Sequence, residues 1–169
     1  MNILITGGTG FLGSRLAKKL SGHNVKIIAR GEQEGYLTKK ELKKFKFESC
    51  DILKKRLLKE FLSRDLDLII HCAARVDIRN NGRCPRGLIE TNLISTVNLM
   101  ETMVELGIKK LIFASSMTVY GIKNRIPVQE DGDLFPVHFY GNTKKWAEEA
   151  IASYAQKGLI NALIVRYPG

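Results

Sequence analysis

The chain has 169 residues, 44% of them hydrophobic and 26% charged, and a formal net charge of +10. This length allows one domain with a real core and is short for two, and the composition excludes a disordered chain. The apolar runs are strand-sized, well below the ~20 residues of a membrane span. No secretory segment precedes Ile3, so we expect a cytoplasmic protein without a membrane partner.

Cysteine content and charge bear on possible partners. Cys50, Cys72 and Cys84 are odd in number and lack CxxC spacing, so we expect reduced thiols and no metal site. Many basic residues fall between positions 39 and 64, interleaved with leucines at helical intervals. This pattern is typical of the solvated faces of amphipathic helices and predicts no nucleic-acid partner. The positive field can still attract a polyanionic cofactor or substrate.

The first predicted element is a strand at residues 3–5, followed by a turn with Gly7, Gly8, Gly10 and Gly13 and then by leucines at helical spacing. Residues without a Cβ let a phosphate approach the main chain, and a helix N-terminus favours an anion. Gly8-x-Gly10-x-x-Gly13 fits the dinucleotide fingerprint, and Gly7-x-x-Gly10-x-x-Gly13 fits a variant of it. The alternative is a glycine-rich connector without a ligand.

A second strand is predicted to end at Ala29, about 20 positions past the glycines, where a dinucleotide fold faces the adenosine ribose. An acidic side chain there would bind a ribose 2′-OH and repel a 2′-phosphate. Ala29 and Arg30 take that place, which favours NADP over NAD. The alternative is that Arg30 is a surface residue that opens the polar loop at residues 31–35.

A third strand is predicted at residues 45–50, with Asp51 and Ile52 at its end and a helix at residues 53–62. Asp51 can accept a hydrogen bond from an adenine amino group. It is also a good helix N-cap, and both roles are compatible.

The fourth predicted strand, residues 67–74, is almost wholly apolar, as expected for a parallel strand covered on both faces. Ala73 and Ala74 at its end leave room for a ligand against the backbone. His71 has no partner at metal or triad spacing, so we expect a packed, hydrogen-bonded side chain. A loop at residues 75–86 follows, at the carboxyl edge of the sheet.

A long amphipathic helix comes after this loop. Asn92 interrupts its apolar stripe on the buried side and should be hydrogen-bonded there, either as a structural tie or in the floor of a site. The predicted stripe consists of Ile89, Leu93, Val97, Met100 and Val104.

The last predicted elements are a strand at residues 109–116, a loop at 117–137, a helix at 140–156 and a strand at 159–166. Alternating strands and helices imply right-handed crossovers, so the fold class is α/β with a doubly wound parallel sheet of six strands. The inward residues of the last helix are predicted to be Ala147, Ala150, Ile151 and Tyr154.

Tyr140 and Lys144 are four residues apart at the start of that helix, so their side chains share one face. An ammonium within reach of a phenol lowers the tyrosine pKa from ~10 toward neutrality and allows proton exchange near pH 7. Ser116, at the end of a neighbouring strand, can hydrogen-bond the same substrate oxygen. The carboxyl edge of a doubly wound sheet is where ligands bind.

With these pieces in order, the chain resembles an extended short-chain dehydrogenase/reductase of the NAD-dependent epimerase/dehydratase type. The resemblance runs from residue 3 nearly to the end of the chain. The matching pieces are Thr6-Gly-Gly-Thr-Gly-Phe-Leu-Gly13, Asp51-Ile52, His71-Cys-Ala-Ala74, Asn92, Ser115-Ser-Met-Thr-Val-Tyr-Gly121 and Tyr140-Gly-Asn-Thr-Lys144.

The resemblance implies that Tyr140 is the catalytic acid/base and that Lys144 also holds the nicotinamide ribose. It implies that Ser116 orients the substrate hydroxyl or carbonyl and that Thr118 contacts the substrate. The implied cofactor contacts are Gly7, Gly10, Phe11 and Leu12 at the pyrophosphate, Asp51 and Ile52 at the adenine, Ala73 and Ala74 along the middle, and Tyr167 and Pro168 near the nicotinamide, with Gly13, Arg30 and Asn92 counted as cofactor-binding too.

The implied function is that of an NAD(P)-dependent oxidoreductase or epimerase that acts on a nucleotide sugar by hydride transfer. An NADP-dependent carbonyl reductase or hydroxysteroid-type dehydrogenase would use the same three catalytic residues. A non-catalytic NAD(P)-binding sensor or RNA-associated protein is the alternative of another class. The sequence does not decide whether the protein forms a homodimer.

Three departures from the family pattern modify this expectation. Sugar-nucleotide dehydratases carry Asp-Glu where this chain has Met117 and Thr118, so dehydration is disfavoured. NAD-specific members usually have an acidic residue at Ala29, so the cofactor is expected to be NAD or NADP. Family members continue past the sixth strand into a substrate lobe. We therefore expect residues 1–169 to be one NAD(P)-binding Rossmann domain, truncated relative to the family and unable to select a substrate alone.

Overall fold

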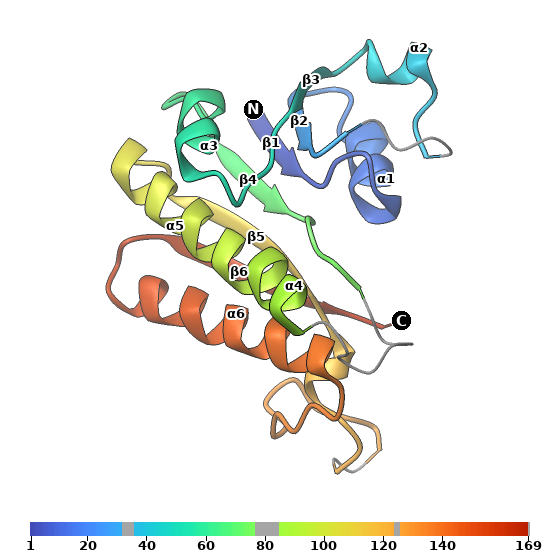
Figure 1. Ribbon diagram of the computed structural model, residues 1–169, viewed down its shortest axis with the longest axis vertical. Helices are drawn as coiled ribbons and strands as arrows, with labels where there is room; N and C mark the ends of the chain where they lie inside the picture. The colour runs from blue at the N-terminus through green and yellow to red at the C-terminus, as the bar shows by residue number, and fades with distance from the viewer. Residues whose placement is uncertain (32–35, 77–84, 124–125, 169) are drawn as a thin grey trace.

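A computed structural model describes residues 1–31, 36–76, 85–123 and 126–168, and its centre is a six-stranded parallel sheet (Figure 1). The strand order is β3-β2-β1-β4-β5-β6. This order confirms the predicted doubly wound sheet, since the chain runs from β1 to one edge and then crosses to the other. The strands are β1 (Asn2–Thr6), β2 (Asn24–Ala29), β3 (Lys46–Ser49), β4 (Leu68–His71), β5 (Lys110–Ser116) and β6 (Asn161–Tyr167).

Helices cover both faces of the sheet, and Figure 1 shows α5 and α6 in front of β5 and β6. The buried core on that face joins α3, α5 and α6, whereas the smaller core on the other face joins α1 and α2. The helical elements are α1 (Phe11–Lys19), α2 (Lys39–Leu42), α3 (Lys55–Phe61), α4 (Pro85–Ile89), a π-helical turn η1 (Glu90–Ile94), α5 (Ser95–Leu106), a 3₁₀ turn η2 (Met117–Val119) and α6 (Phe139–Gln156).

Successive side chains of β1 point to opposite faces of the sheet and contribute to both cores. Ile3 and Ile5 pack with Ala17 of α1, while Leu4 points to the other face and packs in the cluster with Leu99 of α5. All of these side chains are buried, as expected for a central parallel strand.

The strand ends meet at one edge of the sheet. Thr6 of β1 pairs with His71 of β4, His71 pairs with Phe113 of β5, and Ser116 pairs with Tyr167 of β6. The register therefore brings the predicted chemical residues of four strands to the same carboxyl edge.

Several element boundaries differ from the predictions. The fourth strand ends at His71, so Cys72, Ala73 and Ala74 lie beyond it. The helix predicted at 53–62 begins at Lys55, and the segment predicted as a loop at 117–137 opens with η2.

The predicted stripe of the long helix is confirmed in part, since Val97 and Val104 pack against the core beside Met100, but it misses the most buried positions. Of its five members only Met100 is fully buried, and the inward positions include Leu88, Asn92, Thr96 and Leu99. Two causes explain the difference. The π turn η1 rotates the helix, and buried hydroxyl groups bond back to the helix, as Thr96 does to the Asn92 carbonyl at 2.7 Å. The inward face of α6 agrees with its prediction, since Ala147 and Ile151 are fully buried and Ala150 and Tyr154 pack against the core.

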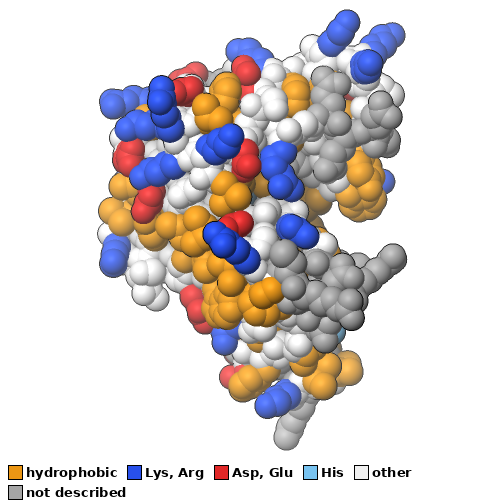
Figure 2. Space-filling view, viewed as in Figure 1, with side chains coloured by type: hydrophobic (Ala, Val, Ile, Leu, Met, Phe, Trp, Pro, Cys, Tyr) orange, Lys and Arg blue, Asp and Glu red, His pale blue; other side chains and the backbone are white. Residues whose placement is uncertain are grey.

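The basic segment at residues 39–64 has its charges at the surface, as predicted, with Leu42 and Leu62 buried beneath them. On the face seen in Figure 2, Lys and Arg side chains are interspersed with Asp and Glu. Lys55, for example, lies 2.8 Å from carboxylate oxygens of Glu101 and Glu105.

Cys50 and Cys72 are free thiols, while Cys84 and most of the predicted loops at 31–35 and 75–86 lie outside the described residues. Within the part of the chain that the structure describes, no helix is long and apolar enough to cross a membrane. The same residues contain no group of His, Cys, Asp and Glu that could hold a metal ion.

Candidate active site

The glycine turn between β1 and α1 is built so that the main chain is exposed to a ligand. Gly7 has a φ of +65°, and a Cβ added to it would lie 2.7 Å from the Ala73 Cα. Gly10 is the N-cap of α1, and a Cβ on Gly13 would lie 2.4 Å from the Gly7 carbonyl oxygen. The turn therefore requires residues without side chains, and it presents a helix N-terminus that suits a phosphate.

Gly8 has a different role from its neighbours. A Cβ there would lie 2.2 Å from Cγ2 of Ile27, so the missing side chain makes room for packing against β2. Gly7 and Gly10, but not Gly8, line the adjoining pocket. The spacing that fits this structure is thus Gly7-x-x-Gly10-x-x-Gly13.

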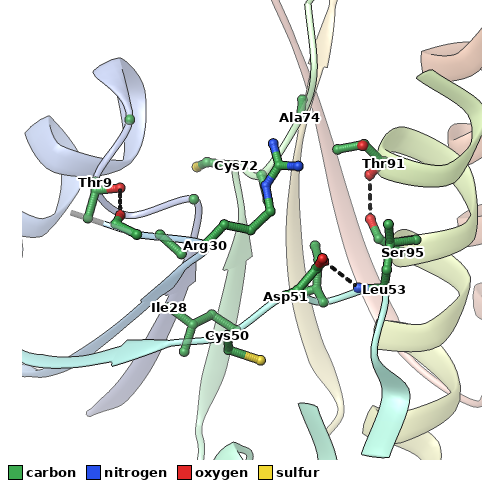
Figure 3. Close-up of a pocket in the computed structure, with 16 residues that line it drawn as sticks. Thr9, Ile28, Arg30, Cys50, Asp51, Leu53, Cys72, Ala74, Thr91 and Ser95 are labelled. Carbon is green, nitrogen blue, oxygen red and sulfur yellow. Dashed lines mark hydrogen bonds between the residues drawn. The ribbon is translucent and has the colours of Figure 1, made fainter. Parts of the chain in front are cut away.

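A pocket opens beside this turn at the carboxyl edge of the sheet (Figure 3). In Figure 3 the Arg30 side chain extends from the end of β2 toward the side where Ala74 lies, and Asp51 approaches from the end of β3. Seven of the predicted cofactor contacts line it, namely Gly7, Gly10, Arg30, Asp51, Ile52, Ala73 and Ala74.

Ala29, predicted to face the adenosine ribose, also lines the pocket. The other lining residues were not predicted as contacts: Thr9, Ile28, Gly31, Cys50, Leu53, Cys72, Thr91 and Ser95. Thr9 lies within the glycine turn and could have been found there. Its Oγ1 donates to the Gly31 carbonyl at 3.2 Å. Thr91 and Ser95 come from the helix across the pocket, and no sequence pattern marks them. Burial raises the pKa of the Cys72 thiol to about 12, so this thiol stays protonated.

Asp51 does not cap α3, contrary to one of its two predicted roles. Its Oδ1 accepts a hydrogen bond from the Leu53 N–H at 3.1 Å, and the N-cap position of α3 is Lys54. The carboxylate thus closes a turn just before the helix begins, and Lys54 takes the N-cap position of α3. Its position on the pocket wall agrees with the predicted adenine contact but does not test it.

His71 and Asn92 are structural ties beneath the pocket. The His71 ring is fully buried, 2.6 Å from Thr6 Oγ1 and 2.9 Å from Thr96 Oγ1, as predicted for a packed histidine. Burial lowers its pKa to about 3, with a smaller effect from Lys144. The Asn92 amide bonds the main chain of Arg75 and, at 3.0 Å, the Thr143 hydroxyl of α6.

Ser116 ends β5 and caps η2. Its Oγ accepts hydrogen bonds from the Thr118 N–H at 3.2 Å and the Thr118 hydroxyl at 3.0 Å. Both side chains are partly exposed, whereas Met117 between them is 48% exposed and has no acidic group. The predicted substrate-side pair is therefore close together.

Tyr140 and Lys144 lie one turn apart in α6, and both are buried. The prediction that the ammonium lowers the tyrosine pKa is wrong for this structure. Burial raises the pKa of Tyr140, and only the Ser116 side chain acts in the opposite direction. The Lys144 ammonium lies 4.0 Å from the centre of the Phe113 ring, and burial lowers its own pKa to about 7. Desolvation therefore favours the neutral form of both groups.

The remaining predicted cofactor contacts lie outside the lining of this pocket. Phe11 is 59% exposed at the start of α1, where its ring meets Tyr36 edge to face at 5.8 Å. Leu12 is half-buried beside it. Tyr167 ends β6 next to Ser116, and Pro168 follows it and lines a separate hollow near Met117.

Parallel strands in this order, a glycine turn after β1 and a pocket at the carboxyl edge define a protein with a Rossmann fold. The chain belongs to the NAD dependent epimerase/dehydratase family, whose model matches residues 3–169. The family agrees with the resemblance inferred from the sequence motifs.

Several known proteins similar to this chain are described as UDP-sugar 4-epimerases. A putative UDP-glucose 4-epimerase of Methanocaldococcus jannaschii is 34% identical over 98% of this chain and 54% of its own length. A bifunctional UDP-glucose and UDP-xylose 4-epimerase of Pisum sativum is 34% identical over 92% of this chain and 47% of its own.

Solved structures give the same result. The UDP-glucose 4-epimerase of Brucella ovis in complex with NAD has a TM-score of 0.90 and 28% identity, covering 99% of this chain and 52% of that one. The UDP-glucose 4-epimerase of Thermotoga maritima with UDP-glucose has a TM-score of 0.89 and 27% identity, covering 99% and 55%. The chain thus spans about half the length of the relatives that it matches.

Proposed function

We propose that this chain is the dinucleotide-binding part of a nucleotide-sugar 4-epimerase, with NAD(P) in the pocket beside the glycine turn. The observation that carries the proposal is the placement of Tyr140, Lys144 and Ser116 at the same sheet edge as that turn. The epimerase relatives support this function over the reductase and the non-catalytic alternatives.

The residues of the pocket fit a dinucleotide. Main-chain atoms of Ala73 and Gly7 fill the space where Gly7 and Gly13 would carry a Cβ, so the turn packs tightly and sets the N-terminus of α1 beside the pocket, where a pyrophosphate can bind. Ile52 and Ala73 offer apolar contacts, and Asp51 offers a hydrogen-bond acceptor on the same wall.

In this proposal Tyr140 exchanges a proton with the sugar hydroxyl, and Ser116 orients that hydroxyl. Because burial raises its pKa, Tyr140 is a neutral phenol at pH 7 and therefore a proton donor in this state. When bound, an oxidised nicotinamide ring would accept the hydride, and its positive charge would favour the Tyr140 phenolate, which takes the proton of the sugar hydroxyl. Lys144 holds the nicotinamide ribose and, when charged, also favours the phenolate.

Arg30 makes NADP the proposed preference over NAD. It lines the pocket at the end of β2, where an acidic residue would repel a 2′-phosphate. The family is described by its dependence on NAD, so a preference of this chain for NADP would come from Arg30 and not from the family.

Binding of the reduced cofactors to the purified chain tests the proposal. Trp146 in α6 is the single tryptophan, so energy transfer from it to NADH or NADPH reports binding. We expect saturable transfer, weakened about tenfold by Lys144→Met, which removes a charged hydrogen-bond donor. Lys145→Met, on the neighbouring surface position, is the matched control. Absence of saturable transfer with both cofactors would refute the proposed function.

A further inference from the structure

A buried carboxylate lies one helical turn beyond Lys144. Glu148 is only 4% exposed and Lys144 only 2%. Both belong to α6 and are four residues apart, so they share its inward face. A buried charge is costly unless other charges or hydrogen bonds compensate for it. Two buried ionisable side chains on one helix face are therefore expected to have specific partners.

Glu148 is held by hydrogen bonds from two strands. The Ser115 hydroxyl of β5 donates to its Oε1. The Arg166 guanidinium of β6 donates through Nε at 3.1 Å to the same oxygen and through Nη2 at 2.8 Å to Oε2. Arg166 also donates through Nη1 to the Tyr120 hydroxyl at 2.7 Å and to the Glu130 carbonyl at 2.8 Å. This carboxylate is therefore fixed in position, and it ties α6 to the ends of β5 and β6.

The surroundings of Lys144 show what the carboxylate does for it. The groups that face the ammonium from other elements are the Phe113 ring of β5, His71 of β4 and Cys72 just after β4. His71 is neutral over most of the pH range because burial lowers its pKa to about 3, and the Cys72 thiol is protonated. Cys72 and Glu148 both favour the charged form of Lys144, but the Cys72 thiol is protonated, which leaves the Glu148 carboxylate on the same face of α6 as the group that acts.

We propose that Glu148 is a positioning residue, whose buried carboxylate favours the charged form of Lys144 against desolvation and fixes α6 against β5 and β6. This inference rests on the proposed function in one respect, because a charged Lys144 matters only if it serves the cofactor and Tyr140. The salt bridge of Glu148 is with Arg166, so its effect on Lys144 acts through space and not through a direct ion pair. Glu148 contacts no substrate or cofactor in this scheme.

The experiment is an NMR titration of the whole chain labelled with ¹³C at the lysine Cε, with the Lys144 signal assigned by its loss in Lys144→Met. Glu148→Gln keeps the shape of the side chain and removes its charge. We expect the midpoint of the Lys144 signal to move to lower pH by about half a pH unit or more. Glu149→Gln, at the adjacent exposed position, should leave the midpoint in place.

Glu148→Gln leaves the Arg166 guanidinium without its partner and could prevent folding. The double variant Glu148→Gln/Arg166→Met removes both charges and serves as the second test, with a smaller downward shift expected because loss of the Arg166 cation acts in the opposite direction. A midpoint unchanged in whichever variant folds would overturn the inference, since a purely structural role would not move it. The titration uses neither cofactor nor substrate, so its outcome is independent of whether the chain binds a dinucleotide.

Discussion

Tyr140 and Lys144 lie one turn apart in α6, and burial shifts their pKa values in opposite directions. It raises the pKa of the phenol and lowers that of the ammonium to about 7. Both effects favour an uncharged pair, because desolvation penalises whichever form is charged. A site of this kind is poised for proton exchange only when positive charge is brought next to the phenol.

Tyr140→Phe tests whether the phenol carries the chemistry. The variant keeps the ring and removes the proton, so dinucleotide affinity should stay within about twofold, while turnover should fall about 10²- to 10⁴-fold. Turnover is measured as 4-epimerisation of a UDP-sugar by a form of the protein that includes a substrate-binding part. Tyr154→Phe, on the same helix, is the matched control. Unchanged turnover in Tyr140→Phe would remove this residue from the mechanism.

His71 should make the fold sensitive to acid. Its folded pKa of about 3 is below the unfolded value of 6.5, so the unfolded state binds more protons between these pH values. The free energy of unfolding should therefore fall as the pH falls through this window, by about 1.4 kcal/mol per pH unit from this group. The measurement is urea unfolding at a series of pH values.

The His71→Phe variant isolates that effect from the carboxylates that titrate in the same range. It loses the bonds to Thr6 and Thr96 and should be less stable at pH 7, but its stability should decline less steeply in acid. His23→Gln, at an exposed position, should follow the unaltered chain. Parallel curves for His71→Phe and the unaltered chain would contradict the assignment.

Gly13→Ala tests the close packing of the glycine turn. The added methyl group would lie 2.4 Å from the Gly7 carbonyl oxygen and 2.8 Å from the Gly8 Cα, so the turn must open. We expect a loss of about 1–3 kcal/mol in stability, as for other overpacked sites, and at least about tenfold weaker NAD(P)H binding. Gly22→Ala has no atom within 4 Å of the new methyl group and should change neither quantity. Equal affinities for the two variants would show that the turn does not hold the cofactor.

The fold could be predicted from the sequence because each apolar strand, the glycine turn and the hydroxyl groups at the end of β5 are marked by short stretches of sequence. The strand register places Ser116 beside Tyr167 at the carboxyl edge, and α6 brings the Tyr140 side chain to Ser116. Properties that depend on packing between distant segments could not be predicted in this way. The pKa of Tyr140 depends on how deeply α6 is buried, which helical spacing does not state.

The same limit explains the residues that sequence reasoning misplaced. The inward face of α5 contains Ser95 and Thr96, whose hydroxyls bond to the helix and can be buried although the residues are polar. The π turn before them shifts the face in a way that a regular period does not reproduce. Asp51 is a residue type that often caps helices, but it lies three residues before the N-cap Lys54 and closes a turn there, which depends on the backbone path.

Arg30→Asp addresses the choice between the two nicotinamide cofactors. The exposed guanidinium of Arg30 lines the pocket at the end of β2, where it can bind a 2′-phosphate. The carboxylate of the variant would repel that phosphate and accept hydrogen bonds from a free ribose 2′-OH. The ratio of the Kd values for NADPH and NADH, measured by energy transfer from Trp146, should rise at least about tenfold in favour of NADH. Arg56→Asp makes the same change in net charge on the exposed side of α3 and should leave the ratio within about twofold, because screening weakens distant surface charges. If Arg30→Asp behaves like Arg56→Asp, Arg30 does not take part in cofactor selection.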